Sequence, residues 1–216
     1  VAVSVKGDTL TYDVKTANAK YPVTVDPTTA VATERLDGYL TYNTNRYYSA
    51  PNTYDAMTTG GYLYTGLNSS DEGYGYLYIY RGYAAFAGLP QAVAIDSVVY
   101  VMPYIYKCST GSYARSWSLS MYDARGYKSA LTTDDWPVLN SPTISYATAI
   151  SISAGSSSYG AYRWRLNTTG NDSVLAACAR ADTLWLGFKG SRDMAAYPGH
   201  GTVERAYWNS STNATP

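Results

Sequence analysis

The chain has 216 residues, of which 46% are hydrophobic and 15% charged, and its 16 basic and 16 acidic residues leave no net charge at pH 7. This length suits one large all-β domain, or one domain with an appendage. The charge balance argues against nucleic-acid binding, which needs a basic face to displace counterions, and against electrostatic attachment to anionic membranes. No apolar run approaches the roughly 20 residues that span a bilayer, so we expect no membrane insertion.

The composition is dominated by tyrosine, with 25 tyrosines against two phenylalanines. Charged residues fall below the roughly 25% usual for soluble domains, so solubility rests on Ser, Thr, Asn, Gly and phenol hydroxyls. Such a surface suits packing against another surface, because little charge must be desolvated, and it also suits sugar binding. A surface adapted to an extracellular setting, without any partner, explains the composition equally well.

The first 30 residues read as a β extension. VAVSV and TLTYDV alternate around a KGD turn, and YPVTVDPT follows as an edge strand, since Pro22 cannot donate to a ladder. The chain starts at Val1, which suggests a processed product or an excised fragment. We expect this extension to be a donor strand for another subunit or the remnant of a preceding domain. The residues that would form the assembly strand are Val1, Val3, Val5, Tyr21, Val23 and Val25.

From residue 31 the rhythm becomes that of a β-sandwich. Period-two runs rich in aromatic and β-branched residues are separated by turn residues, which is typical of a sandwich or barrel. Residues 43–60 read as loop, and residues 173–180 read as one short helix capped by Asn171 or Asp172. Trp136 anchors a helical turn or an ordered loop. We therefore predict a jelly-roll-like antiparallel β-sandwich over residues 31–208 and a polar tail over 209–216. The runs cover residues 31–40, 61–67, 74–86, 95–108, 114–124, 158–167, 182–190 and 202–208.

The segment GYGYLYIYRG places a tyrosine at every second position. Because successive side chains of a strand point to opposite faces, Leu77 and Ile79 should face the core, with Arg81 at the end of their row. A second run alternates in the same way, with Val99, Val101 and Ile105 between Tyr100, Tyr104 and Tyr106. Two such rows in one sheet would form an aromatic plate, covered either by the chain itself or by a partner or sugar. The phenols of the first row are Tyr74, Tyr76, Tyr78 and Tyr80.

Cysteines and glycosylation sequons favour secretion and an extracellular or cell-surface location. Cys108 and Cys178 are far apart and belong to no metal-binding motif. They form one disulfide, or they are two buried thiols; both alternatives stay open. The expected acceptors for N-glycosylation are Asn68, Asn167, Asn171 and Asn209, with Asn213 weakened by the proline that follows its sequon.

The sequence offers little for catalysis. The single histidine, His200, lies in a Gly- and Pro-rich stretch, and no GxSxG elbow is present. The paired acids Asp71-Glu72 and Asp134-Asp135 lie in turn contexts, where carboxylates cap backbone amides. A calcium ion at Asp134 or Asp135 is a weak alternative. We therefore expect no enzyme activity and no cofactor.

Aromatic residues in irregular segments are the candidates for stacking on sugars. Trp117, Trp164 and Trp185 lie inside predicted strands, and we expect them to belong to the core or to be partly buried. The remaining candidates for a sugar-facing surface are Tyr47, Tyr48, Tyr54 and Trp136, for which loop anchoring is the alternative role.

Two stretches carry a resemblance to a known family. RGYAAFAGLPQAVAIDSVVYVMPYIYKC has an aromatic-ending strand, a Leu-Pro turn and an Ile-x-Ser strand, and YPVTVDPT resembles the segment that precedes such domains. Together they resemble the DNRLRE or disaggregatase-related domains of large secreted bacterial and archaeal proteins, over about residues 31–208. The resemblance implies a jelly roll similar to carbohydrate-binding modules. The family's Phe-Asp is Phe86-Ala87 here and its DNRLRE string is absent, so no binding residue is carried over.

Two functions follow as expectations. The first is an extracellular structural protein that self-associates through tyrosine-rich sheet faces and its terminal strand into a filament or surface assembly. The second is a carbohydrate-binding or adhesive module of a larger secreted protein, with a polysaccharide as partner.

Overall fold

The computed structural model describes residues 2–6, 9–13, 38–45, 54–58, 62–69, 76–87, 89, 99–101, 104–125, 131–140, 142–180, 182–193 and 201–209. The chain divides into two compact units, Val1–Ala30 and Val31–Pro216. In the described part, no helix is long and apolar enough to cross a membrane.

The smaller unit contains one antiparallel hairpin. Strand β1 (Ala2–Lys6) pairs with β2 (Thr9–Asp13), and the register sets Val3 opposite Tyr12 and Val5 opposite Leu10. Val3 and Val5 of the expected assembly strand thus lie in β1. The other expected members, Val1, Tyr21, Val23 and Val25, fall outside the described residues.

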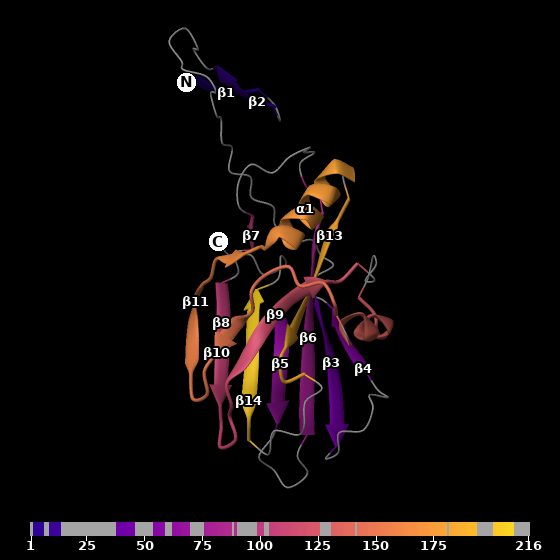
Figure 1. Ribbon diagram of the computed structural model, residues 1–216, viewed down its shortest axis with the longest axis vertical. Coiled ribbons are helices and arrows are strands. Elements are labelled where there is room, and N and C mark those ends of the chain that lie inside the picture. Colours follow the sequence, from indigo (N-terminus) through magenta and orange to yellow (C-terminus); the bar gives the residue numbers. More distant parts are fainter. Residues whose placement is uncertain are drawn as a thin grey trace. The chain divides into compact units, whose positions relative to one another are not determined.

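The larger unit is built on one long antiparallel sheet, which confirms the predicted all-β fold (Figure 1). Its strands follow the spatial order β10-β9-β13-β6-β5-β14-β8-β11, and β3 lies on the other side of β6 and carries β4. A separate two-stranded ladder joins β7 to β12. The strands are β3 (Gly38–Asn45), β4 (Tyr54–Thr58), β5 (Tyr62–Ser69), β6 (Tyr76–Phe86), β7 (Tyr100–Val101), β8 (Tyr104–Thr110), β9 (Trp117–Asp123), β10 (Ile150–Ile152), β11 (Ser157–Ala161), β12 (Trp164–Arg165), β13 (Leu184–Gly190) and β14 (Val203–Asn209).

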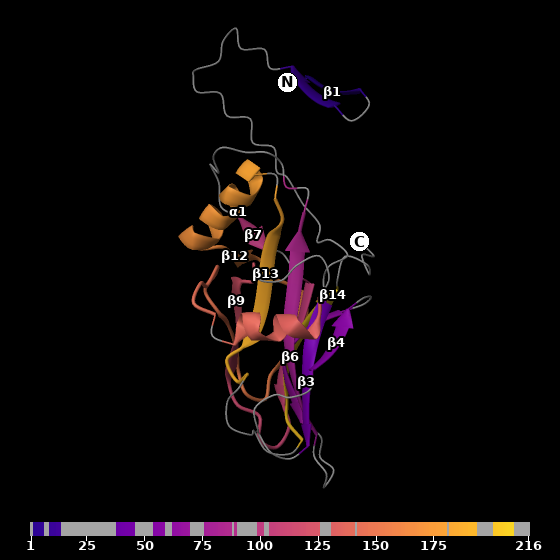
Figure 2. The same ribbon diagram turned by 90° about the vertical axis from the view of Figure 1, so that its right-hand side faces the viewer.

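The sheet becomes a sandwich because it forks at β6. The first part of β6 pairs with β5, over residues 77–80, and the second part pairs with β13, over residues 82–86. Both partners lie on the side of β6 opposite β3. From this fork, β5, β14, β8 and β11 run into one layer, while β13, β9 and β10 run into the layer that packs on it (Figures 1 and 2).

Two buried clusters fill the interior. The larger one lies between the two layers and includes Leu63, Trp117, Phe188 and Trp208. The smaller one lies between the sheet and the 3₁₀ helix η1 (Thr133–Leu139), and it includes the predicted core residues Leu77 and Ile79, which are 2% and 1% exposed. In Figure 2, η1 crosses in front of β6 and β3.

Several local expectations need correction. Helix α1 spans Thr168–Arg180 and begins five residues earlier than expected, because Asn167, rather than Asn171 or Asp172, caps it by accepting a hydrogen bond from the Gly170 amide at 2.8 Å. The stretch 43–60, expected to be loop, contains the end of β3 and all of β4. Pairing with a long neighbouring strand can impose strand structure where sequence periodicity is weak.

Candidate functional site

The most distinctive surface is a continuous row of tyrosine rings on the outer face of the sheet. Six adjacent strands contribute to it, in the spatial order β3, β6, β5, β14, β8 and β11. We call it the tyrosine row. It consists of Tyr39, Tyr78, Tyr80, Tyr64, Tyr207, Tyr106 and Tyr159.

Strand register creates the row. Tyr64, Tyr207, Tyr106 and Tyr159 lie directly opposite one another in four adjacent strands. Their ring centroids are 5.2 Å, 4.9 Å and 6.3 Å apart along the series. Tyr80 joins them diagonally, at 5.7 Å from Tyr64. Such aromatic cross-strand pairs stabilise a sheet by about 0.2–1 kcal/mol each.

Period-two alternation therefore produces the outer row that the sequence suggested, but with different members. Tyr78 and Tyr80 belong to it, whereas Tyr76 is described only through its backbone pairing with Asn45, and Tyr74 lies outside the described residues. Tyr39, Tyr64, Tyr159 and Tyr207 are new members. Tyr39, Tyr159 and Tyr207 each sit in a strand without a second tyrosine on the same face, so only the register between strands could have revealed them. Strand β5 begins with the alternating run Tyr62-Leu63-Tyr64, so its periodicity could have indicated Tyr64.

The second expected stripe is broken. Tyr100 pairs with Arg165 in the separate β7–β12 ladder, whereas Tyr106 lies in β8 and joins the row. The sequence has Pro103 between these two strands, and a proline cannot donate to a ladder. The two halves of the expected strand therefore pair with different neighbours. Of the phenols expected on this stripe, Tyr106 is the member that the described ring contacts place in the row.

The row is half-buried and weakly charged. Its rings shield one another, and Tyr159, at its end, is 54% exposed. The guanidinium of Arg205 lies 5.7 Å from the ring centroids of both Tyr64 and Tyr207, within reach of a cation–π interaction. Burial raises the pKa of Tyr80 to about 12, although Arg205 and a hydrogen bond with Asn68 act to lower it. The phenol of Tyr80 thus stays a neutral hydrogen-bonding group at physiological pH.

Trp136, a candidate for sugar contact, is instead fully buried. Its ring lies 3.9 Å from the guanidinium of Arg81, which is itself 0% exposed. Arg81 donates to both carboxylate oxygens of Asp193, at 2.6 and 3.2 Å, to the Trp136 carbonyl at 2.6 Å and to Asn140 Oδ1 at 2.8 Å. This buried cluster attaches η1 to the sheet, so the anchoring role of Trp136 applies. Of the other sugar-facing candidates, Tyr54 lies in β4, and Tyr47 and Tyr48 lie outside the described residues.

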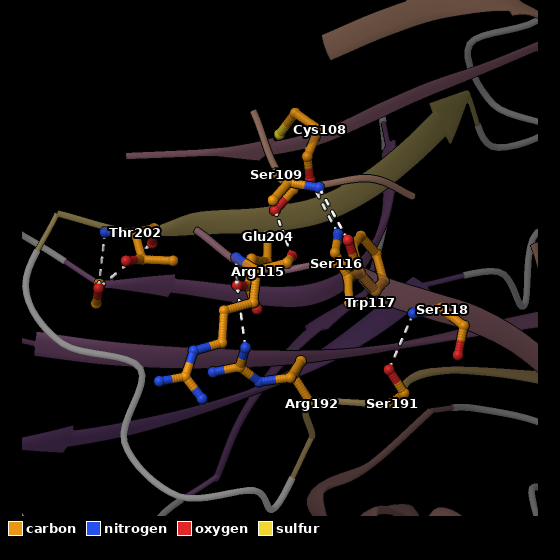
Figure 3. Close-up of polar contacts among 12 residues, drawn as sticks. Cys108, Ser109, Arg115, Ser116, Trp117, Ser118, Ser191, Arg192, Thr202 and Glu204 are labelled. Atoms are coloured by element: carbon orange, nitrogen blue, oxygen red, sulfur yellow. Dashed lines mark hydrogen bonds and ion pairs between the residues drawn. The ribbon is translucent and has the colours of Figure 1, made fainter. Parts of the chain in front are cut away.

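A second buried carboxylate lies at the end of the sandwich where β14 begins (Figure 3). Oε1 of Glu204 accepts from the Arg115 amide at 2.8 Å and lies 3.3 Å from Arg192 Nη1. Oε2 is buried and has no hydrogen-bond partner among the described residues. Burial raises the pKa of Glu204 despite both arginines. Ser109, whose hydroxyl donates to the Arg115 carbonyl, and Thr202, which is held by Ser69, complete the surroundings. These contacts tie the β8–β9 connection to β14 and β13.

The described residues offer no obvious reaction centre. They contain no group of three or more His, Cys, Asp and Glu side chains that could hold a metal ion. Asp135 caps η1 by accepting from the Thr132 amide at 2.8 Å, which is the capping role expected for this pair of acids; Asp134 is exposed. Asp71, Glu72 and His200 fall outside the described residues.

A pocket of about 190 Å³ lies beside α1, between Arg125, Tyr146, Arg180 and Trp185.

The two cysteines are free thiols, so the disulfide alternative is not what the structure contains. Cys108 shares the face of β8 that carries Tyr106, by strand alternation, whereas Cys178 belongs to the interior cluster under α1. A sheet thus separates them.

Among the sequons, Asn167 is exposed, but its side-chain amide caps α1 and donates to the Ser145 carbonyl at 2.9 Å. Asn68 and Asn171 are half-buried, and Asn209 ends β14.

Comparison with known proteins finds no family model that matches this chain and no curated protein with significant similarity to it.

Proposed function

We propose that this chain is an extracellular, non-enzymatic structural protein that self-associates into a filament or surface assembly. The observation that carries the proposal is the tyrosine row. It offers a second copy a broad, weakly charged face that spans six strands.

The chemistry of the row favours a protein partner. Tyrosine gives a large contact area at low conformational cost, and it is enriched at interfaces where one end of the side chain is apolar and the other is hydrated. Arg205 adds an arginine, a residue type that is also enriched at the energetic centres of interfaces. Because the rings already contact one another, few rotamers remain to be frozen when a second surface docks.

Substitution within the row tests this proposal. Exchanging Tyr64 and Tyr207 for serine removes two central rings and should reduce self-association at least about tenfold, which corresponds to about 1.4 kcal/mol. Sedimentation velocity over a concentration series measures the effect, and circular dichroism verifies the fold. The matched control is Tyr113→Ser, because Tyr113 is 56% exposed and has no ring contact with the row. Equal association of the double variant and the control would refute the proposal.

A polysaccharide ligand is the second candidate, and the linearity of the row favours it. Tyr64, Tyr207, Tyr106 and Tyr159 are aligned across four strands, at a strand spacing of about 4.8 Å, and an extended glycan could stack along such a line. The resemblance of the sequence to jelly-roll domains similar to carbohydrate-binding modules points the same way. Pull-down on insoluble polysaccharides distinguishes the two functions. A chain that stays monomeric, binds a glycan and loses the glycan in the Tyr64→Ser, Tyr207→Ser variant would favour this candidate over self-association.

A further inference from the structure

One edge of the large sheet lacks the usual protection against strand addition. Strand β11 (Ser157–Ala161) pairs along all five residues with β8 and stands at the end of the strand order. An edge strand directs half of its backbone N–H and C=O groups away from the sheet, where another strand can pair with them.

Natural edges are blunted by charge, proline or short length, and β11 has none of these. Its sequence, SSYGA, contains no charged residue and no proline, and four of its five residues are exposed. The other two sheet edges differ. Strand β10 has only three residues, and β4 carries Asp55.

The open edge continues the proposed interface. Tyr159 of β11 lies opposite Tyr106 and is the last ring of the tyrosine row, at 54% exposure. A strand added beyond β11 would extend the same outer face by one more strand. Pairing through the backbone and packing on the row would then reinforce each other.

We propose that the β1–β2 hairpin of a second copy adds to the β11 edge. This assignment rests on the proposed self-association and names the two surfaces that meet. A two-stranded hairpin is at best marginally stable alone in water, and β1 and β2, with five residues each, match β11 in length. Pairing two different surfaces on each copy is heterologous, and it generates an open-ended polymer when the rotation between copies does not close a ring.

A charge on the edge tests the acceptor. In the Ser158→Glu variant, the new carboxylate faces Lys107 across the β8–β11 ladder, so the isolated copy keeps its fold while the edge gains an inward-pointing charge. Self-association should weaken at least about tenfold. The matched control is Ser151→Glu, at an exposed position of the edge strand β10. Equal association of Ser158→Glu and wild type, with both folded by circular dichroism, would overturn the assignment.

Cysteine crosslinking tests the donor. Copies bearing Ser158→Cys are mixed with copies bearing Ser4→Cys, in β1, or Thr11→Cys, in β2, and the mixtures are oxidised. The two native thiols are buried and should not react. We expect a disulfide-linked dimer with at least one hairpin variant and none when Ser151→Cys replaces Ser158→Cys. Crosslinking of Ser158→Cys only with itself would show edge-to-edge pairing and overturn the hairpin assignment. A wild-type chain that stays monomeric at every concentration would instead refute the proposed function itself.

Discussion

Arg81 is a charged residue at a core position of β6, and its environment explains why it is tolerated there. Buried charges need both an ion-pair partner and hydrogen bonds to their remaining groups. Asp193, the Trp136 carbonyl and Asn140 supply these for the guanidinium. Alternation in the sequence placed Arg81 in the row of Leu77 and Ile79. It could not identify partners that are 55 to 112 residues away, because only the fold brings them together.

Removing the partner of this arginine should be far more costly than breaking an exposed pair. Asp193→Ala leaves a buried guanidinium without its counterion and should destabilise the protein by about 3–5 kcal/mol. Asp182→Ala is the control, because the Arg180–Asp182 pair is 3.7 Å long and more than half exposed, and such pairs contribute about 0–1 kcal/mol. Urea denaturation at neutral pH measures both. Similar losses in the two variants would show that the buried cluster does not hold η1 as described.

Glu204 should make stability fall as the pH rises above 4.5, its ordinary pKa. Because burial raises the pKa of Glu204 in the folded chain, the folded state keeps this proton at pH values where the unfolded state has lost it. In that interval the folded state binds more protons, so the free energy of unfolding decreases with increasing pH. Urea denaturation of wild type and of Glu204→Gln, whose amide does not titrate, isolates the effect. A wild-type curve that runs parallel to the variant's, or rises relative to it, would contradict the raised pKa.

At the scale of the elements, the fork at β6 decides the architecture. Strands β5 and β13 share one side of β6 and come together at two glycines: a Cβ on Gly190 would lie 3.3 Å from the Gly66 Cα. The strand runs were readable from the sequence, since periodicity reports which face of each strand is buried. The fork was not readable, because a long strand such as β6 looks the same whether it has one or two partners on a side.

Gly66→Ala should severely damage the pairing of β5 with β14. Gly66 has a φ of +115°, and an added Cβ would lie 2.2 Å from the Glu204 carbonyl oxygen, which is backbone and cannot rotate away. The dihedral strain alone should cost about 1–3 kcal/mol, and the overlap adds to it. Gly160→Ala in β11 is the control, because nothing lies within 4 Å of its Cβ position; it should change stability by less than about 0.5 kcal/mol. Comparable melting temperatures for Gly66→Ala and Gly160→Ala would mean that β5 does not pass β14 as closely as described.

At the scale of the whole molecule, the sheet collects tyrosines that are scattered through the sequence into one face. Alternation explains why each phenol points outward, and antiparallel register explains why Tyr64, Tyr207, Tyr106 and Tyr159 line up. The alternating tyrosines of β6 predicted an aromatic face. Its full extent depends on which strands are neighbours in space, and composition or periodicity carries no information about that order.

The central claim is that this face is an interface between copies of the chain. Sedimentation velocity of the full chain over a wide concentration series, with electron microscopy of the most concentrated sample, tests it most directly. We expect the mean sedimentation coefficient to rise with concentration and elongated or layered particles to be visible. A folded chain that sediments as a monomer at every concentration, and shows no ordered assemblies, would contradict the claim.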